Sequence, residues 1–236
     1  MTLLSVPYRS RRRGRSRRGH VLPLLTSALI AVLAVTAVAY LLWPTWAPKV
    51  PDTNEPLPVS IGETLFNVPP HAFRRKVQRH SGPQERIDLN FVYPSLAPPD
   101  APKHVTAETV EDTPQPIDRI FLSIAAHHDS LAPDILVRTI YPRYLDEAAT
   151  VPQDGLSMRA FRDSTPYAGE DLFSAETPAM VARCTRDTVT PGMCLSERRI
   201  GDADLTFRFP RQWLTQWRAV AAAMERLTRQ LRGPQT

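Results

Sequence analysis

The sequence lacks the short motifs by which many enzyme classes are identified. Its 236 residues contain no Gly-x-Ser-x-Gly elbow, Walker phosphate loop, dinucleotide fingerprint, His-Glu-x-x-His zinc motif or Cys-x-x-Cys pair. No internal repeat is present. Enzymes can lack such motifs, so these absences argue against an enzyme without excluding one. They predict no cofactor and identify no catalytic residue.

Cysteine is almost absent, because Cys184 and Cys194 are the only two in the chain. A metal site would need further ligands close by, and none is adjacent to either cysteine. In an oxidising compartment, two cysteines of an exported domain normally form a disulfide. We therefore expect a bond between Cys184 and Cys194 and no metal site.

Charged residues are missing from residues 21–43, a run of twenty-three positions. A helix of that length covers ~34 Å, which is enough to cross the ~30 Å hydrocarbon core of a bilayer. Its apolar residues lie on all faces and not on one stripe, so a buried core helix fits less well. The run predicts a transmembrane helix in the lipid bilayer. Ala37-Val38-Ala39 also fits a signal-cleavage site, so a cleaved, exported protein is the alternative.

Acidic residues are missing from residues 1–20. This tail instead contains Arg9, Arg11, Arg12, Arg13, Arg15, Arg17 and Arg18. Short Arg-rich segments stay on the cytoplasmic side of a membrane. The tail is thus a topology signal that predicts a single-pass protein of the bacterial inner membrane, with its C-terminal domain in the periplasm.

The net charge of +5 comes from this tail. Without its 7 arginines, 22 of the 29 basic residues remain against 24 acidic ones, a net charge of −2 for residues 21–236. A nucleic-acid partner therefore has no electrostatic support in the exported part.

Proline marks the next boundary, because fourteen of the 24 prolines lie in residues 44–116. Residues 44–58 alternate proline with polar residues and predict an extended tether. Residues 59–236 are long enough for one domain with its own core. Five of these prolines lie in residues 95–116 and indicate a long surface loop.

Hydrophobic periodicity predicts an α+β domain with a mainly antiparallel sheet. Alternating residues indicate strands at 87–93, 156–162 and 205–209, and a hairpin whose arms are 179–184 and 193–200. A first strand is expected at 59–66, a short one within 166–173, and a strand covered on both faces at 117–126. Residues 131–141 predict a helix capped by Ser130.

The last predicted helix, residues 211–232, has one apolar stripe. The stripe comprises Trp213, Trp217, Val220, Met224, Leu227 and Leu231. Packing of this long helix on the sheet is the simpler interpretation, and a homodimer through the same stripe is the alternative.

Two clusters are candidate sites. Arg74, Arg75, Lys76 and Arg79 form the only basic cluster outside the tail, which predicts a solvated surface or a contact with lipid head groups or another polyanion. His127, His128 and Asp129 follow the strand at 117–126. Adjacent strand residues point to opposite faces, so His127 could act with Asp129 but not with His128.

Four short runs resemble a group of uncharacterised, single-span bacterial envelope proteins. They are Arg86-Ile87-Asp88-Leu89, Pro166-Tyr167-Ala168-Gly169-Glu170-Asp171, Cys194-Leu195-Ser196-Glu197-Arg198-Arg199 and Phe209-Pro210-Arg211-Gln212-Trp213-Leu214. The resemblance covers residues 58–232 and implies no activity, cofactor or catalytic residue. Together with the topology, it predicts a component that binds or scaffolds an envelope protein partner. The alternative is an anchored periplasmic enzyme with a site near His127, His128 and Asp129.

Overall fold

The structure is a computed structural model that describes residues 21–42, 55–100, 117–128 and 130–232. The arginine tail, most of the predicted tether, residues 101–116 of the predicted loop and Asp129 lie outside the described residues. The chain divides into two units, residues 1–49 and 50–236.

The first unit contains one described helix, α1 (Val21–Leu42). The side chains of α1 are described from Leu25 to Leu41, and its large apolar ones are all more than half exposed. Within the described ranges, no helix is long and apolar enough to cross a membrane. The helix itself is confirmed, and its membrane-spanning role stays a prediction.

The second unit begins with a three-stranded sheet. Its strands are β1 (Leu57–Ile61), β2 (Thr64–Val68) and β3 (Gly82–Pro83), in the order β2-β1-β3. The sequence predicted one strand over 59–66. The chain instead reverses at Gly62, whose φ of +58° suits glycine, and β2 returns antiparallel to β1.

An eight-stranded antiparallel sheet forms the body of this unit, in the order β4-β5-β11-β10-β9-β8-β7-β6. Its strands are β4 (Arg86–Val92), β5 (Arg119–Ala126), β6 (Leu145–Gln153), β7 (Leu156–Phe161), β8 (Glu170–Ala175), β9 (Met180–Thr185), β10 (Met193–Ile200) and β11 (Ala203–Pro210). The predicted antiparallel sheet and hairpin are confirmed. Strand β6 was not predicted, because its residues show no clear alternation.

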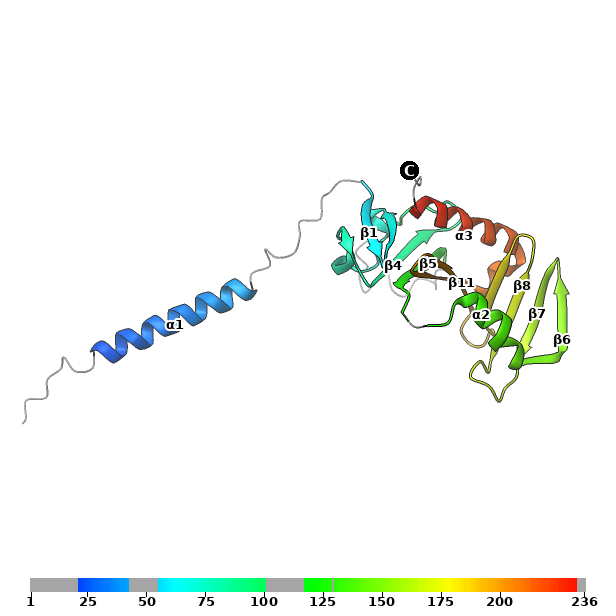
Figure 1. The fold of residues 1–236 in the computed structure, drawn as a ribbon, viewed down its shortest axis with the longest axis horizontal. Helices are drawn as coiled ribbons and strands as arrows, with labels where there is room; N and C mark the ends of the chain where they lie inside the picture. The colour runs from blue at the N-terminus through cyan, green and yellow to red at the C-terminus, as the bar shows by residue number, and fades with distance from the viewer. Residues whose placement is uncertain (1–20, 43–54, 101–116, 129, 233–236) are drawn as a thin grey trace, which may run out of the picture. The chain divides into compact units, whose positions relative to one another are not determined.

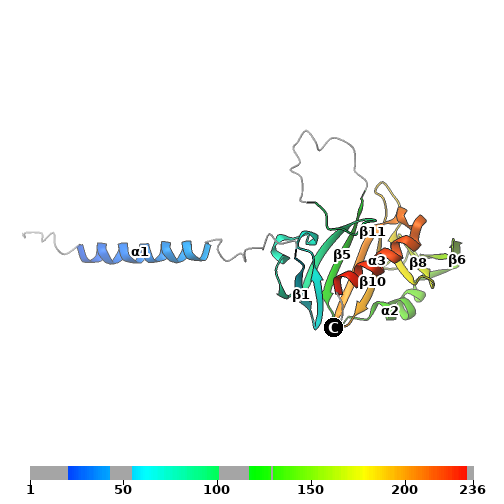
Figure 2. The ribbon, with the colours of Figure 1, turned by 90° about the horizontal axis from the view of Figure 1, so that it is seen from above.

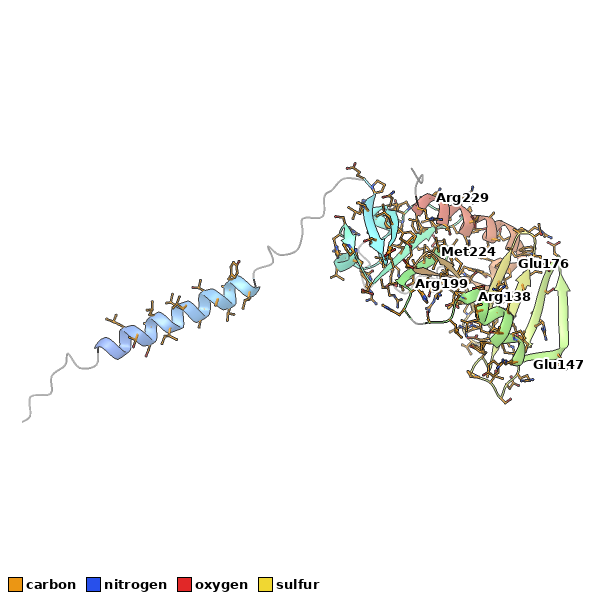
Figure 3. The ribbon with its side chains drawn as sticks, in the orientation of Figure 1. Arg138, Glu147, Glu176, Arg199, Met224 and Arg229 are labelled. Atoms are coloured by element: carbon orange, nitrogen blue, oxygen red, sulfur yellow. A yellow bond between two sulfur atoms is a disulfide. The ribbon has the colours of Figure 1, made fainter. Side chains whose placement is uncertain are left out.

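The C-terminal helix covers one face of this sheet (Figures 1 and 2). A 3-10 segment, η8 (Arg211–Gln216), leads into α3 (Trp217–Arg232). The whole predicted stripe is buried in one core with sheet residues such as Leu122 and Phe207. Figure 3 shows Met224 on the side of α3 that faces the sheet and Arg229 on the side away from it. The stripe therefore packs on the sheet of its own chain.

The opposite face of the sheet is covered only in part. The helical turns α2 (Pro133–Ile135), η6 (Leu136–Ile140) and η7 (Tyr141–Arg143) build a second apolar cluster with β6 to β9. No described helix covers β4, β5 and β11 on this side. The prediction that β5 is covered on both faces was wrong, because Phe121 and Ser123 stay half exposed while their neighbours Ile120, Leu122 and Ile124 are buried.

Candidate functional site

The candidate site is the uncovered sheet face opposite α3, which we call the open face. It comprises three rows across β4, β5, β11 and β10: Arg86, Ala125, Asp204 and Arg199; Asp88, Ser123, Thr206 and Glu197; and Asn90, Phe121, Arg208 and Leu195. Every second residue of a strand points to the same side, so the apolar residues between them face α3 and these twelve face away. The result is a polar, charged surface on a rigid sheet.

Two segments border the open face. Next to β4, Phe73 forms a β-bridge with Leu89, and the amide of Arg74 donates to the carbonyl of Asp88 at 2.9 Å. On the other side, the α2 and η6 turns pack against β10 and β9. A small hollow lies there, lined by Pro133, Val137, Tyr141, Val181, Arg183, Leu195 and Glu197. The face is therefore bordered by a bridged segment beside β4 and by helical turns beside β10.

The hollow lies where two strands separate. Strands β9 and β10 pair only at Cys184 with Cys194 and at Arg183 with Leu195. Beyond these two register pairs, β10 continues beside β11 alone. The side chain of Glu197 therefore lies next to an interruption of the ladder and below η6.

Phe121 lies in the middle of the third row and carries an arginine on each side. The guanidinium carbon of Arg74 is 4.8 Å from the ring centroid, a cation–π contact. Arg208 lies directly opposite Phe121 in β11 and is exposed. Among the described residues, no carboxylate lies within ion-pair distance of either arginine. Neither guanidinium is therefore neutralised by a carboxylate of the described residues.

Asp88, in the second row, is already neutralised. Arg86 donates to its carboxylate at 2.9 and 3.1 Å, and Arg75 lies 3.6 Å away. Burial raises the pKa of Asp88, but hydrogen bonds from Arg86, Ser123 and Gln78 outweigh burial and lower it. The buried carboxylate is a structural ion pair at the edge of the face.

The residues of the predicted basic cluster have different neighbours in the fold. Arg74 reaches Phe121 and Arg75 reaches Asp88, whereas Lys76 is exposed at the start of η4 (Lys76–Gln78). The Nε atom of Arg79 is buried and has no hydrogen-bond partner among the described residues. The polyanion contact of these four side chains stays a prediction.

The charged residues around the hollow, Glu197, Arg183 and Glu170, were not predicted from the sequence as a site. Burial raises the pKa of Glu197, although Arg183 and Arg208 act in the opposite direction. Arg183 lies 4.8 Å from the Tyr167 ring and 3.1 Å from Glu170, although that ion pair lacks hydrogen-bond geometry. Burial also raises the pKa of Tyr141 to about 12. The only sequence signal was the alternation within β9 and β10, which assigns these residues to one face.

The histidines predicted as an alternative site behave differently from each other. His128 is exposed and lies 3.4 Å from Glu85, whereas His127 is half-buried in a cluster with Ser130, Arg199 and Asp204. Figure 3 labels Arg199, which comes from β10. The prediction that Ser130 caps the helix was wrong, because its hydroxyl donates to Asp204 at 3.3 Å and does not cap α2.

The His127 cluster resembles a catalytic triad in composition but not in geometry. Arg199 donates to His127 Nε2 at 3.0 Å, and since arginine only donates, this nitrogen must accept. The other nitrogen then carries the proton of the neutral ring and faces Ser130 Oγ at 3.4 Å. No lone pair is left to take the serine proton, which nucleophilic catalysis requires. The cluster instead joins the end of β5 to β10 and β11.

A second ion-pair cluster lies beside the disulfide. Cys184 and Cys194 are bonded across β9 and β10, with their α carbons 3.9 Å apart, which confirms the predicted bond. Asp171, opposite Cys184 in β8, is buried and accepts from Arg186 at 2.9 Å and from Arg211 at 2.6 Å. The described residues contain no group of three or more His, Cys, Asp or Glu that could hold a metal ion.

Comparison with solved structures gives a fold likeness. An immunity protein of the Stenotrophomonas maltophilia type IV secretion system aligns with a TM-score of 0.51 and 14% identity, over 75% of this chain and 92% of that chain. The iron-regulated outer membrane lipoprotein FrpD of Neisseria meningitidis aligns with a TM-score of 0.40 and 10% identity, over 73% and 92%. Neither a known protein family nor a curated protein matches the sequence. The first likeness shows a shared fold and nothing further.

Proposed function

We propose that this chain is an envelope protein that binds a protein partner through the open face of its large sheet. The observation that carries the proposal is the contrast between the two faces. Helix α3 packs on one and buries its apolar residues, whereas twelve polar, charged or half-exposed side chains occupy the other over four strands. A rigid sheet that leaves such a surface uncovered offers a preorganised binding platform.

Binding accounts for the described residues better than catalysis does. His127, the strongest candidate base, has both ring nitrogens engaged, and the carboxylates of Asp88 and Asp204 are held by arginines. A general base must be free to accept a proton from substrate. Among the described residues, the open face thus presents cations and an aromatic ring, and His127 and Ser130 do not form a nucleophile–base pair.

We further propose that α1 anchors the domain to the inner membrane. Support comes from the uncharged run over residues 21–43 and from the seven arginines before it. A reporter enzyme that is active only outside the cytoplasm, fused after Thr236, should be active. N-terminal sequencing of the purified chain should find the helix retained, and a mature chain beginning near Tyr40 would show a cleaved signal instead.

Photo-crosslinking in membranes tests the binding surface. A photo-reactive amino acid replaces Thr206, in the middle of the open face, and in the control it replaces Ala222, which is exposed on α3. Position 206 should give a crosslink to one envelope protein, identified by mass spectrometry, and position 222 should not. Recovery of the chain as a lone species from both positions would refute the proposal.

A second candidate is an immunity role, favoured by the fold shared with an immunity protein of a secretion system. A strain without this chain should then be inhibited by contact with cells of its own kind that carry an active secretion system. Equal growth of the two strains in that competition would remove this candidate and leave the binding proposal in place.

A further inference from the structure

We propose that the open face recognises an acidic segment of a protein, with Arg74 and Arg208 binding its carboxylates on the two sides of Phe121. The inference rests on the proposed function, because it names the chemistry of the partner that the face would accept. It is carried by the charge balance of the face and by the placement of these three side chains.

The charge balance of the open face differs from that of the domain. Residues 21–236 carry 22 basic and 24 acidic residues, so a cationic surface on this domain is local. The carboxylates of Asp88 and Asp204 are already paired with Arg86 and Arg199. Arg74 and Arg208 are left over, with no ion pair among the described residues. An acidic partner would complete the electrostatic complementarity of this face.

Glu197 does not neutralise Arg208. Arg208 lowers the pKa of Glu197 through space, but the two form no ion pair or hydrogen bond in the described residues. Glu197 points toward the hollow below η6, whereas Arg208 is exposed beside Phe121. The guanidinium of Arg208 thus keeps its donors for a ligand.

The geometry suits a carboxylate next to an apolar group. Side chains directly opposed on antiparallel strands have β carbons about 5 Å apart, so Arg208 borders the ring of Phe121. A guanidinium can bind a carboxylate through two parallel hydrogen bonds. Arg74 is already held over the ring, which reduces the side-chain entropy lost when it binds. An extended segment with alternating acidic and apolar residues matches this pattern.

A protein segment fits these observations better than a membrane surface. A flat anionic surface is bound by protruding cations that act together. Here Arg74 lies over Phe121 and Arg75 lies 3.6 Å from Asp88, so two of the four clustered cations already have neighbours within the domain. Arg74 and Arg208 instead flank one aromatic ring on the face of a sheet, where an extended chain can lie across the strands.

Peptide binding to the full-length protein in detergent tests the inference. The probes are a fluorescein-labelled peptide that alternates Glu and Val and a matched peptide that alternates Gln and Val, followed by fluorescence anisotropy. The variants are R74Q and R208Q, and R208K keeps the charge but loses the two-pronged geometry. R229Q is the matched control, because it removes an exposed arginine from the side of α3 that faces away from the sheet.

The Glu peptide should bind more tightly than the Gln peptide, and salt should weaken it. R74Q and R208Q should each weaken binding by about tenfold or more, R208K by less than R208Q, and R229Q by less than about twofold. Equal binding of the two peptides, or equal effects of R208Q and R229Q, would overturn the inference. So would Arg208-dependent binding to anionic phospholipid vesicles without binding of the Glu peptide.

Failure of this inference is separable from failure of the proposed function. If the crosslinker at position 206 captures an envelope protein while the Glu peptide shows no dependence on Arg74 or Arg208, the face binds a partner of other chemistry. If position 206 captures nothing in membranes, the proposed function fails whatever the peptide does. Circular dichroism of each variant confirms that the substituted protein is folded.

Discussion

Asp171→Ala should lower the free energy of unfolding by about 3 kcal/mol. The carboxylate is 4% exposed and accepts from Arg186 Nε at 2.9 Å and from Arg211 Nη2 at 2.6 Å. Its removal leaves two guanidinium groups without their anion. Removing one partner of a buried ion pair usually costs about 3 to 5 kcal/mol, because the other partner is left as an uncompensated charge.

The structure places the cost at the low end of that range. The side chain of Arg186 is 38% exposed, so water can solvate its charge once the carboxylate is gone. Arg211 is 17% exposed but keeps the carbonyl of Thr185, 3.1 Å from its Nη1 atom. Both arginines therefore retain part of their solvation. For a domain of this size, about 3 kcal/mol corresponds to a fall in Tm of about 6 to 12 °C.

Thermal unfolding of the full-length protein in detergent, followed by circular dichroism, measures the effect. Asp163→Ala is the matched control, because Asp163 lies 3.6 Å from the same Arg186 but is 91% exposed. Its Tm should stay close to that of the parent protein. Equal losses in the two variants would refute the reasoning, since burial of Asp171 would then make no difference.

Three further predictions concern single groups. The Cys184→Ser, Cys194→Ser double variant should lose about 2 to 3 kcal/mol of stability and still fold, and thiol counting under non-reducing, denaturing conditions should find no free thiol in the parent protein. The pKa of Asp88 is lowered in the folded state, so ionised Asp88 stabilises the fold above its ordinary pKa, and this contribution is lost as the pH falls through the lowered pKa. In Asp88→Asn, the urea midpoint of unfolding should therefore fall less steeply at acid pH than in the parent protein. The pKa of Glu197 is raised by burial. The contribution of Glu197 to stability is therefore greatest below its ordinary pKa of 4.5 and falls as the pH rises through the raised pKa of the folded state. Glu197→Gln should therefore raise the urea midpoint at pH ~7, and an unchanged midpoint would contradict the assignment.

Much of the sheet could be predicted from local patterns. The alternation of Leu205, Phe207 and Phe209 identified β11, and the 3,4 spacing of the last helix identified the stripe that packs on the sheet. The disulfide followed from the presence of only two cysteines, both in the exported part of the chain. Each of these signals is contained within one segment of the chain, so a single sequence is enough to read it.

The site could not be predicted, because it depends on contacts between distant segments. Arg199 reaches His127 from 72 positions away, and Arg211 reaches Asp171 from 40. The apolar run of β5 indicated a strand covered on both sides, but only tertiary packing decides whether a helix covers Phe121. Arg208 looked like an ordinary polar residue in an alternating strand, and only the register places it beside that ring.

The short ladder between β9 and β10 divides the large sheet into two blocks of backbone hydrogen bonds. Strands β4, β5, β11 and β10 form one block, and β6 to β9 form the other. Cooperative opening of hydrogen-bonded backbone can therefore stop at this line, so that amides of β6 to β9 can exchange without those of the open face. Side-chain packing under α3 and the Cys184–Cys194 bond, more than backbone pairing, join the two blocks.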